Sequence, residues 1–298
     1  MKSLALVLFG FVLTGSLAQA SVCKDLKPST SDVIFLDYDD CEFAEDLSHV
    51  FNEIKETFGG PNVTLVIGTE SDNAAFDLGH MIELPYRMIF YGRYGQEYPV
   101  PRANVVTAAA HEYGHSIFHE RVKKEFPQFT ELAKDLANLS NVKEAYYRKQ
   151  VPYSKVDEAN KEIAKVTNYA DFVNYLSAYS EFFADVIAVY QYDSKSAMVQ
   201  ALYYDAMSKE EFNYISLRDF DHEPSMRYEN QLSEEHAKLA FVRAWIGKNM
   251  WPENRDQARV YADKILNAIM KLAKEDIKAG VSPEYREMND RLIAELQK

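Results

Sequence analysis

Residues 104–122 read NVVTAAAHEYGHSIFHERV and contain the motif His111-Glu112-Tyr113-Gly114-His115. Its spacing predicts one helix, and the uncharged residues on both sides of the motif favour a buried one. On a helix, positions four apart differ by about 40° of rotation, so the side chains of His111 and His115 leave the same face one turn apart. The motif therefore predicts a pair of imidazoles that can share one ligand.

Two neutral imidazoles at this spacing can bind a zinc ion at about 2.0–2.1 Å. Glu112 is offset on the same helix, so that it faces the open coordination position of such a metal. There it can take a proton from a water molecule that the zinc activates. We therefore predict His111 and His115 as zinc ligands and Glu112 as the catalytic general base. His119 lies two turns beyond His111, too far along the helix axis, and we expect a structural or exposed histidine there.

The third ligand that zinc requires is predicted in the stretch 179–185, YSEFFAD. It belongs to an apolar helix expected at 176–192, in which Glu181 and Asp185 are the only acids. Buried carboxylates are costly unless they are paired or bound to a metal. We therefore expect Glu181 to bind zinc and Asp185 to accept a hydrogen bond from a ligand imidazole, which fixes the tautomer of the ring. The alternative is a solvent-facing acidic pair on a surface helix.

The motif HEYGH followed by EFFAD resembles the gluzincin group of zinc metallopeptidases, to which thermolysin belongs. The expected order of elements before the motif is also similar to the zincin half-domain. The resemblance implies one zinc ion per chain, bound by His111, His115 and Glu181, with Glu112 as general base and Asp185 supporting a histidine. It further implies a peptide or protein substrate. The 66 positions from His115 to Glu181 exceed the thermolysin spacing, so the helices between them are an insertion.

A group that stabilises the oxyanion is expected after the third ligand, because gluzincins usually place a histidine, tyrosine or arginine there. The candidates are His222 and Tyr228 in the polar, loop-like stretch 219–231, and His236 with Arg243 on the following helix. We favour His222 over the others. The alternative for either histidine is an ordinary surface residue.

Two other classes of metal protein use parts of the same pattern. A helical di-iron carboxylate oxidoreductase needs a second Glu-x-x-His, and no other histidine has a glutamate three residues before it. A non-catalytic interaction protein with a structural zinc site needs a fourth protein ligand, and no fourth His or Cys stands at ligand spacing. The metzincin pattern is excluded because Phe118 occupies the position of its glycine. The sequence therefore favours a zinc metalloprotease.

The elements around the motif helix predict an α+β fold of zincin type. Apolar residues at helical spacing predict a helix at 41–58, and short β-branched runs predict strands. The expected strands are 32–36, 62–68, 79–84 and 87–91, followed by a loop at 92–101. Helical periodicity then recurs at 128–139, 156–166, 176–192, 195–207, 233–250, 256–279 and 283–296. We therefore predict a small mixed subdomain at 21–122, ending in the motif helix, and a larger helical subdomain at 123–298.

The composition excludes several other classes of protein. The chain of 298 residues is 47% hydrophobic and has 11 glycines and 10 prolines, which argues against collagen-like, linker-like and globally disordered proteins. Its formal net charge of −13 repels nucleic acid and anionic lipid, so we expect neither as a partner.

The first residues predict export. The apolar run at 4–13 and the Ala18-Gln19-Ala20 pattern are typical of a signal peptide over 1–20, with a buried first helix as the alternative. The run is too short to span a membrane. We therefore expect a secreted or periplasmic protein that is not inserted in a membrane after cleavage. Cys23 and Cys41, the only cysteines, are expected to form a disulfide, with two free thiols as the alternative.

Overall fold

The computed structural model describes residues 31–36, 41–69, 73–85, 89–91, 97–202 and 213–298. The predicted signal peptide and Cys23 lie outside these ranges, so export and the disulfide to Cys41 stay predictions. Within the described ranges, no helix combines the length and the apolar character needed to cross a membrane.

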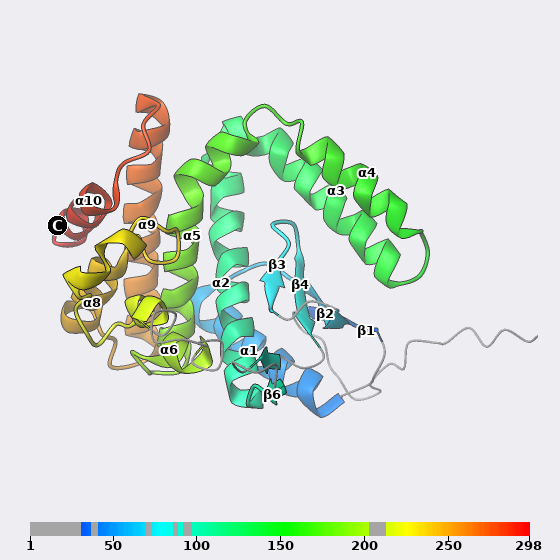
Figure 1. Cartoon of the computed structure of the whole chain (residues 1–298), viewed down its shortest axis with the longest axis horizontal. Coiled ribbons are helices and arrows are strands. Elements are labelled where there is room, and N and C mark those ends of the chain that lie inside the picture. Colours follow the sequence, from blue (N-terminus) through cyan, green and yellow to red (C-terminus); the bar gives the residue numbers. More distant parts are fainter. Residues whose placement is uncertain (1–30, 37–40, 70–72, 86–88, 92–96, 203–212) are drawn as a thin grey trace, which may run out of the picture.

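A four-stranded mixed sheet forms the first part of the described chain (Figure 1). Its order is β1-β2-β4-β3, and β1 (Ser31–Phe35), β2 (Val63–Thr69) and β4 (Met81–Pro85) are parallel to one another. The short β3 (Ala75–Phe76) pairs antiparallel with β4 and is the edge strand on that side. The sheet therefore ends next to the helical part of the molecule in a two-residue edge strand.

Helices make up most of the rest of the described chain. α1 (Cys41–Phe58) links β1 to β2, and its apolar residues at helical spacing are buried. The following helices are α2 (Arg102–Glu125), α3 (Thr130–Tyr147), α4 (Tyr153–Ile163), α5 (Tyr169–Gln191), α6 (Ala197–Leu202), α8 (Ala240–Asn249), α9 (Arg255–Ala279) and α10 (Tyr285–Leu296). Figure 1 shows α2 and α5 side by side, with the sheet beyond α2 and α9 beyond α5.

One continuous apolar core joins the sheet, α1, α2, α5 and α9. On the opposite face of the sheet, a smaller buried cluster of Ile34, Val66 and Met81 packs against Tyr147 of α3. The sheet is thus covered on both faces, and α2 passes through the centre of the molecule. This central position buries most of the motif helix, including His111 and His115.

The α+β prediction is confirmed in its general form, a small mixed sheet followed by helices, and α1 has the predicted bounds. Two strands were not predicted. β3 has only two residues, too few for a periodic signal. β6 (Glu97–Pro99) lies in the stretch predicted as a loop, where it pairs with β5 (Ile89–Tyr91).

Several helix ends differ from the prediction. The motif helix ends at Glu125 instead of 122, and α5 begins at Tyr169 instead of 176. The expected helix at 233–250 is wrong over its first turns, because α8 begins at Ala240.

Candidate metal centre

The helices α2 and α5 approach each other closely at Gly114 and Ala184. A Cβ atom at Gly114 would lie 2.7 Å from the Cα of Ala184, nearer than real Cβ atoms approach their neighbours. The glycine of the motif therefore permits the contact between the two helix backbones. This contact sets the motif histidines against the face of α5 that carries Glu181.

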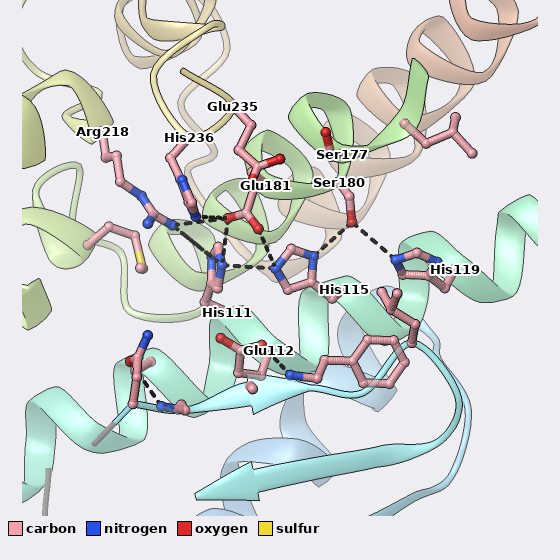
Figure 2. Close-up of a pocket in the computed structure, with 18 of the residues that line it drawn as sticks. His111, Glu112, His115, His119, Ser177, Ser180, Glu181, Arg218, Glu235 and His236 are labelled. Carbon is pink, nitrogen blue, oxygen red and sulfur yellow. Dashed lines mark hydrogen bonds and ion pairs between the residues drawn. The ribbon is translucent and has the colours of Figure 1, made fainter. Parts of the chain in front are cut away.

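Three of the predicted ligands meet at one point between these helices (Figure 2). The Nε2 atoms of His111 and His115 are 3.1 Å apart. The Glu181 carboxylate places Oε2 at 3.3 Å from His111 Nε2 and Oε1 at 3.3 Å from His115 Nε2. Donor atoms around a tetrahedral zinc at about 2.0–2.1 Å stand about 3.3–3.4 Å from one another. The donor separations therefore fit a zinc ion.

The chemistry of the three donors also favours a cation. Glu181 Oε2 is buried and has no hydrogen bond among the described residues, and its contacts are ion pairs with His111 Nε2 at 3.3 Å and His236 Nε2 at 3.4 Å. Buried carboxylates are costly unless they are paired or bound to a metal. A metal ion at this point would supply the positive charge that the carboxylate needs without protonation of the histidines.

Both ligand imidazoles are oriented from α5 through their other ring nitrogen. Asp185 Oδ1 lies 3.0 Å from His111 Nδ1, and Ser180 Oγ lies 2.8 Å from His115 Nδ1. When Nδ1 carries the proton, the Nε2 lone pair is left for a metal. The predicted contact of Asp185 with an imidazole is present. Ser180 was not predicted, although its place directly before Glu181 was a signal for it.

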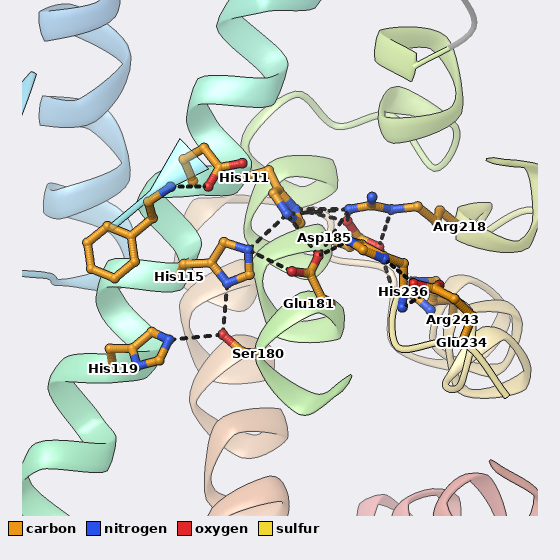
Figure 3. A network of polar contacts seen from close by, with 12 residues as sticks. His111, His115, His119, Ser180, Glu181, Asp185, Arg218, Glu234, His236 and Arg243 are labelled. Atoms are coloured by element: carbon orange, nitrogen blue, oxygen red, sulfur yellow. Dashed lines mark hydrogen bonds and ion pairs between the residues drawn. The ribbon is translucent and has the colours of Figure 1, made fainter. Parts of the chain in front are cut away.

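Asp185 is fully buried between two arginines (Figure 3). Arg218 Nη2 lies 2.5 Å from Asp185 Oδ1, and Arg243 Nη2 lies 2.7 Å from Oδ2. Burial favours the neutral acid, but the guanidinium charges of Arg218 and Arg243 outweigh it and hold the pKa of Asp185 well below its usual range. The alternative of a solvent-facing acidic pair is therefore wrong for Asp185. Arg218 had no sequence signal, because it approaches from a distant part of the chain.

The protonation of the ligands follows from the same contacts. Burial favours the neutral ring of His111, but Asp185 and Glu181 outweigh it and raise the pKa of His111 to about 9. Burial likewise opposes ionisation of Glu181, yet the two histidines hold its pKa well below the usual range. A zinc ion competes with the proton on His111, because only the deprotonated nitrogen is a ligand.

Glu112 lies close to His111 and His115 but, unlike Glu181, is not described as forming ion pairs with them. Its candidate ligand atom and those of His111 and His115 all lie within 4.8 Å of one another. Its Oε2 accepts a hydrogen bond of 2.7 Å from the backbone N–H of Phe76 in β3. The edge strand therefore holds the carboxylate that the sequence predicts as the general base.

The structure brings one of the predicted oxyanion candidates to the site. His236 Nε2 lies 3.4 Å from Glu181 Oε2, and its Nδ1 lies 2.7 Å from Glu234 Oε1. Burial opposes protonation, but Glu234 and Glu181 raise the pKa of His236, which favours the form whose Nε2–H can donate.

The favoured candidate, His222, is not brought to the site. Its side chain is exposed and contacts Asp219 at 2.9 Å, and it is not among the described residues that line the cavity beside the metal position. The side chain of Tyr228 lies outside the described part of the structure. His236 therefore replaces His222 as the geometrically supported candidate.

A cavity of about 300 Å³ opens beside the metal position. Its wall includes the backbone region of β3, the motif residues, and parts of α5 and α6. His119 also lines this cavity and is buried. Of the two expectations for this residue, a structural or an exposed histidine, the exposed one is therefore wrong. Burial lowers the pKa of His119 to about 3, which leaves the ring neutral.

Comparison with protein-family models, curated proteins and solved structures gives no match, so the interpretation rests on the residues and their geometry.

Replacing Gly114 with alanine is expected to destabilise the fold by about 1–3 kcal/mol, the usual cost of overpacking. The added Cβ forces α2 and α5 apart at Ala184 and moves the histidines away from Glu181, so zinc affinity should fall as well. In an open helix the same change stabilises by up to about 1 kcal/mol, so the direction is diagnostic. Thermal unfolding and zinc titration measure both effects. An equally stable or more stable variant contradicts the close-contact explanation.

Proposed function

We propose that the protein is a zinc-dependent metallopeptidase of the gluzincin type that hydrolyses peptide bonds. The observation that carries the proposal is the convergence of His111, His115 and Glu181 on one point, with Glu112 facing that point from the cavity side. These three residues would hold a zinc ion, and a catalytic zinc site with three protein ligands keeps its fourth position for water or substrate. The predicted signal peptide places this activity outside the cytoplasm.

The base of the reaction is Glu112. When bound at the three donors, zinc would supply a Lewis acid and lower the pKa of water towards about 7. The Glu112 carboxylate accepts the proton from the attacking water and later passes it to the leaving amine. The hydrogen bond from Phe76 N holds one carboxylate oxygen and leaves the other for this transfer.

His236 and Arg218 line the cavity on the side of His111 and can donate hydrogen bonds to the negative oxygen that forms during hydrolysis. His236 directs Nε2 towards the metal position, and Glu234 fixes the ring through Nδ1. Arg218 reaches the same cavity and is held by its pairing with Asp185. Donors held in place before the reaction stabilise developing charge without reorganisation. We therefore assign His236 as the main oxyanion donor and Arg218 as a second donor at the cavity.

The edge strand favours an extended peptide as the substrate. β3 pairs with β4 on one side only, and residues 73–76 line the cavity next to Glu112. An edge strand can recognise an extended chain by strand addition, and on β3 such a chain would pair beside the N–H of Phe76, which is itself bonded to Glu112. A peptide bond laid along β3 would pass the metal position and the general base together.

One observation supports a second candidate, a structural zinc site in a non-catalytic protein. His236 Nε2 lies close enough to Glu181 to act as a fourth ligand after a small movement. A site with four protein ligands has no open position for a substrate. In that case His236 variants would lose zinc, whereas an oxyanion donor can be removed with the zinc retained.

The proposal is tested by digesting a broad peptide library with the purified zinc-loaded protein. We expect hydrolysis that stops on chelation and returns on addition of zinc. Zinc binding without cleavage of any library member, under conditions where the fold is intact, contradicts the peptidase proposal and favours the structural site.

A further inference from the structure

The backbone N–H that binds Glu112 belongs to a very short strand. Phe76 N donates to Glu112 Oε2 at 2.7 Å, and β3 pairs with β4 through Ala75 and Phe76 alone. So short a pairing gives the backbone little rigidity of its own. The position of this N–H therefore depends also on what holds the turn that follows it, residues 77–80.

Inside the turn, the carboxylate of Asp77 binds the backbone. Its Oδ1 accepts from the N–H groups of Gly79 at 3.0 Å, His80 at 3.2 Å and Met81 at 2.9 Å. Leu78 has a φ of 64°, in the left-handed region that bulky residues rarely adopt. Strain of this kind persists only where the surrounding contacts over-determine the conformation.

The contacts from outside the turn come from α3. Ser140 is fully buried, and its hydroxyl donates to Asp77 Oδ2 at 2.5 Å and accepts from His80 N at 3.2 Å. A Cβ atom at Gly79 would lie 1.7 Å from Ser140 Oγ and 3.0 Å from the carbonyl oxygen of Leu136. The turn therefore lies in direct contact with α3, and one buried hydroxyl binds both its side chain and its backbone.

The same face of α3 continues along β4. Ser140, Glu144 and Tyr147 stand four and three residues apart, which places them on one side of the helix. Glu144 Oε2 lies 3.3 Å from His80 Nε2, and the Tyr147 hydroxyl donates to Glu83 Oε2 at 3.0 Å. Polar contacts thus join α3 to the turn and to β4.

These contacts lead from α3 to the proposed general base in few steps. Ser140 binds the carboxylate of Asp77, and Asp77 directly follows Phe76, whose N–H binds Glu112. No residue of α3 is among the described residues that line the cavity. Any influence of α3 on Glu112 must therefore pass through β3 and its turn.

We propose that Ser140 is a positioning residue for the general base. Through Asp77 it holds β3 in place, so that the N–H of Phe76 fixes the Glu112 carboxylate beside the metal position. This inference rests on the proposed peptidase function. It gives α3, in the segment between His115 and Glu181, a role in hydrolysis, because a base held in the reactive geometry has less freedom to lose during the reaction.

Ser140→Ala tests the proposal by removing the hydroxyl and little else. We expect kcat to fall by about ten-fold or more, since a displacement of about 1 Å can cost about 10²-fold. KM and zinc content should stay close to those of the wild type, because Ser140 touches neither the cavity nor the predicted ligands. An unchanged kcat overturns the proposal. A higher KM with an unchanged kcat also overturns it, because the turn would then shape the cavity without positioning the base.

Tyr147→Phe is the matched control. It removes a hydrogen bond from the same face of α3 to β4, but it leaves the turn at 77–80 untouched, and Glu83 keeps its pair with Lys143. The variant should lose some thermal stability and keep the kcat of the wild type. An equal fall in kcat in both variants indicates a general loosening of α3 and contradicts the specific role of Ser140.

Hydrogen exchange of the Phe76 amide gives a readout that does not need hydrolysis. In Ser140→Ala this amide should exchange about two- to ten-fold faster, which is the scale of one lost hydrogen bond. Tyr147→Phe should leave its exchange unchanged. Unchanged exchange in Ser140→Ala overturns the link from α3 to the Glu112 contact, whether or not the protein cleaves peptides.

The two readouts separate this inference from the proposed function. Faster exchange together with a lower kcat supports the positioning role, and faster exchange with the kcat of the wild type contradicts it. A zinc-loaded wild type that cleaves no peptide contradicts the peptidase function and with it any role of Ser140 in hydrolysis. Faster exchange in Ser140→Ala would in that case still show that α3 holds the contact between Phe76 and Glu112.

Discussion

Replacing Glu112 with glutamine is expected to reduce peptide hydrolysis by about 10²–10⁴-fold, the usual scale of general acid–base catalysis. The amide keeps the size of the side chain, and its oxygen can still accept the hydrogen bond from Phe76 N. It cannot accept the proton from water. Zinc content and thermal stability should therefore stay close to those of the wild type, and steady-state kinetics with a cleaved peptide measures the loss.

Glu120→Gln is the matched control for this variant. Glu120 lies on the same helix, where it contacts Lys124 at 3.3 Å. The same chemical change there should leave hydrolysis unaltered. If Glu112→Gln loses zinc as strongly as a ligand variant does, Glu112 is a ligand and the assigned general base is wrong.

Replacing His236 with phenylalanine is expected to lower kcat by about 10²–10³-fold, the scale for removal of one oxyanion donor. The ring keeps much of its packing against the cavity but loses the nitrogen that faces Glu181 and the contact to Glu234. KM should change little, because the donor acts mainly on charge that develops during the reaction. Kinetics and metal analysis on the same preparation separate the two roles of this histidine.

His222→Phe serves as the control, because His222 is exposed and contacts only Asp219 among the contacts described for it. It should behave as the wild type in every assay. Loss of zinc from His236→Phe identifies a fourth ligand and supports the structural zinc site. An effect of His222→Phe equal to that of His236→Phe contradicts the geometric assignment.

Local periodicity was enough to predict the part of the site that lies on two helices. The spacing of His111 and His115, and the isolation of Glu181 and Asp185 on an apolar helix, follow from helix geometry alone. What the sequence did not show is how closely the helices approach. The small residue at position 114 makes that contact, and its meaning depends on Ala184, which lies on another helix.

The remaining groups at the site depend on contacts between distant segments. β3 is too short for a periodic signal, yet the backbone N–H of Phe76 holds Glu112, the proposed general base. Arg218 and His236 approach from irregular parts of the chain, whose path follows from tertiary packing and not from spacing. His222 and His236 were therefore hard to tell apart, since each has an acid two or three residues before it.

We infer that His111, His115 and Glu181 hold one zinc ion, and metal analysis of the purified protein is the direct test of this claim. We predict about one zinc per chain in the wild type and much less in Glu181→Gln, because a neutral amide is a poorer ligand than a carboxylate. Both proteins should be folded, as circular dichroism can show. Three results would contradict the claim. The wild type could take up no zinc, it could carry two iron atoms per chain, or Glu181→Gln could hold as much zinc as the wild type.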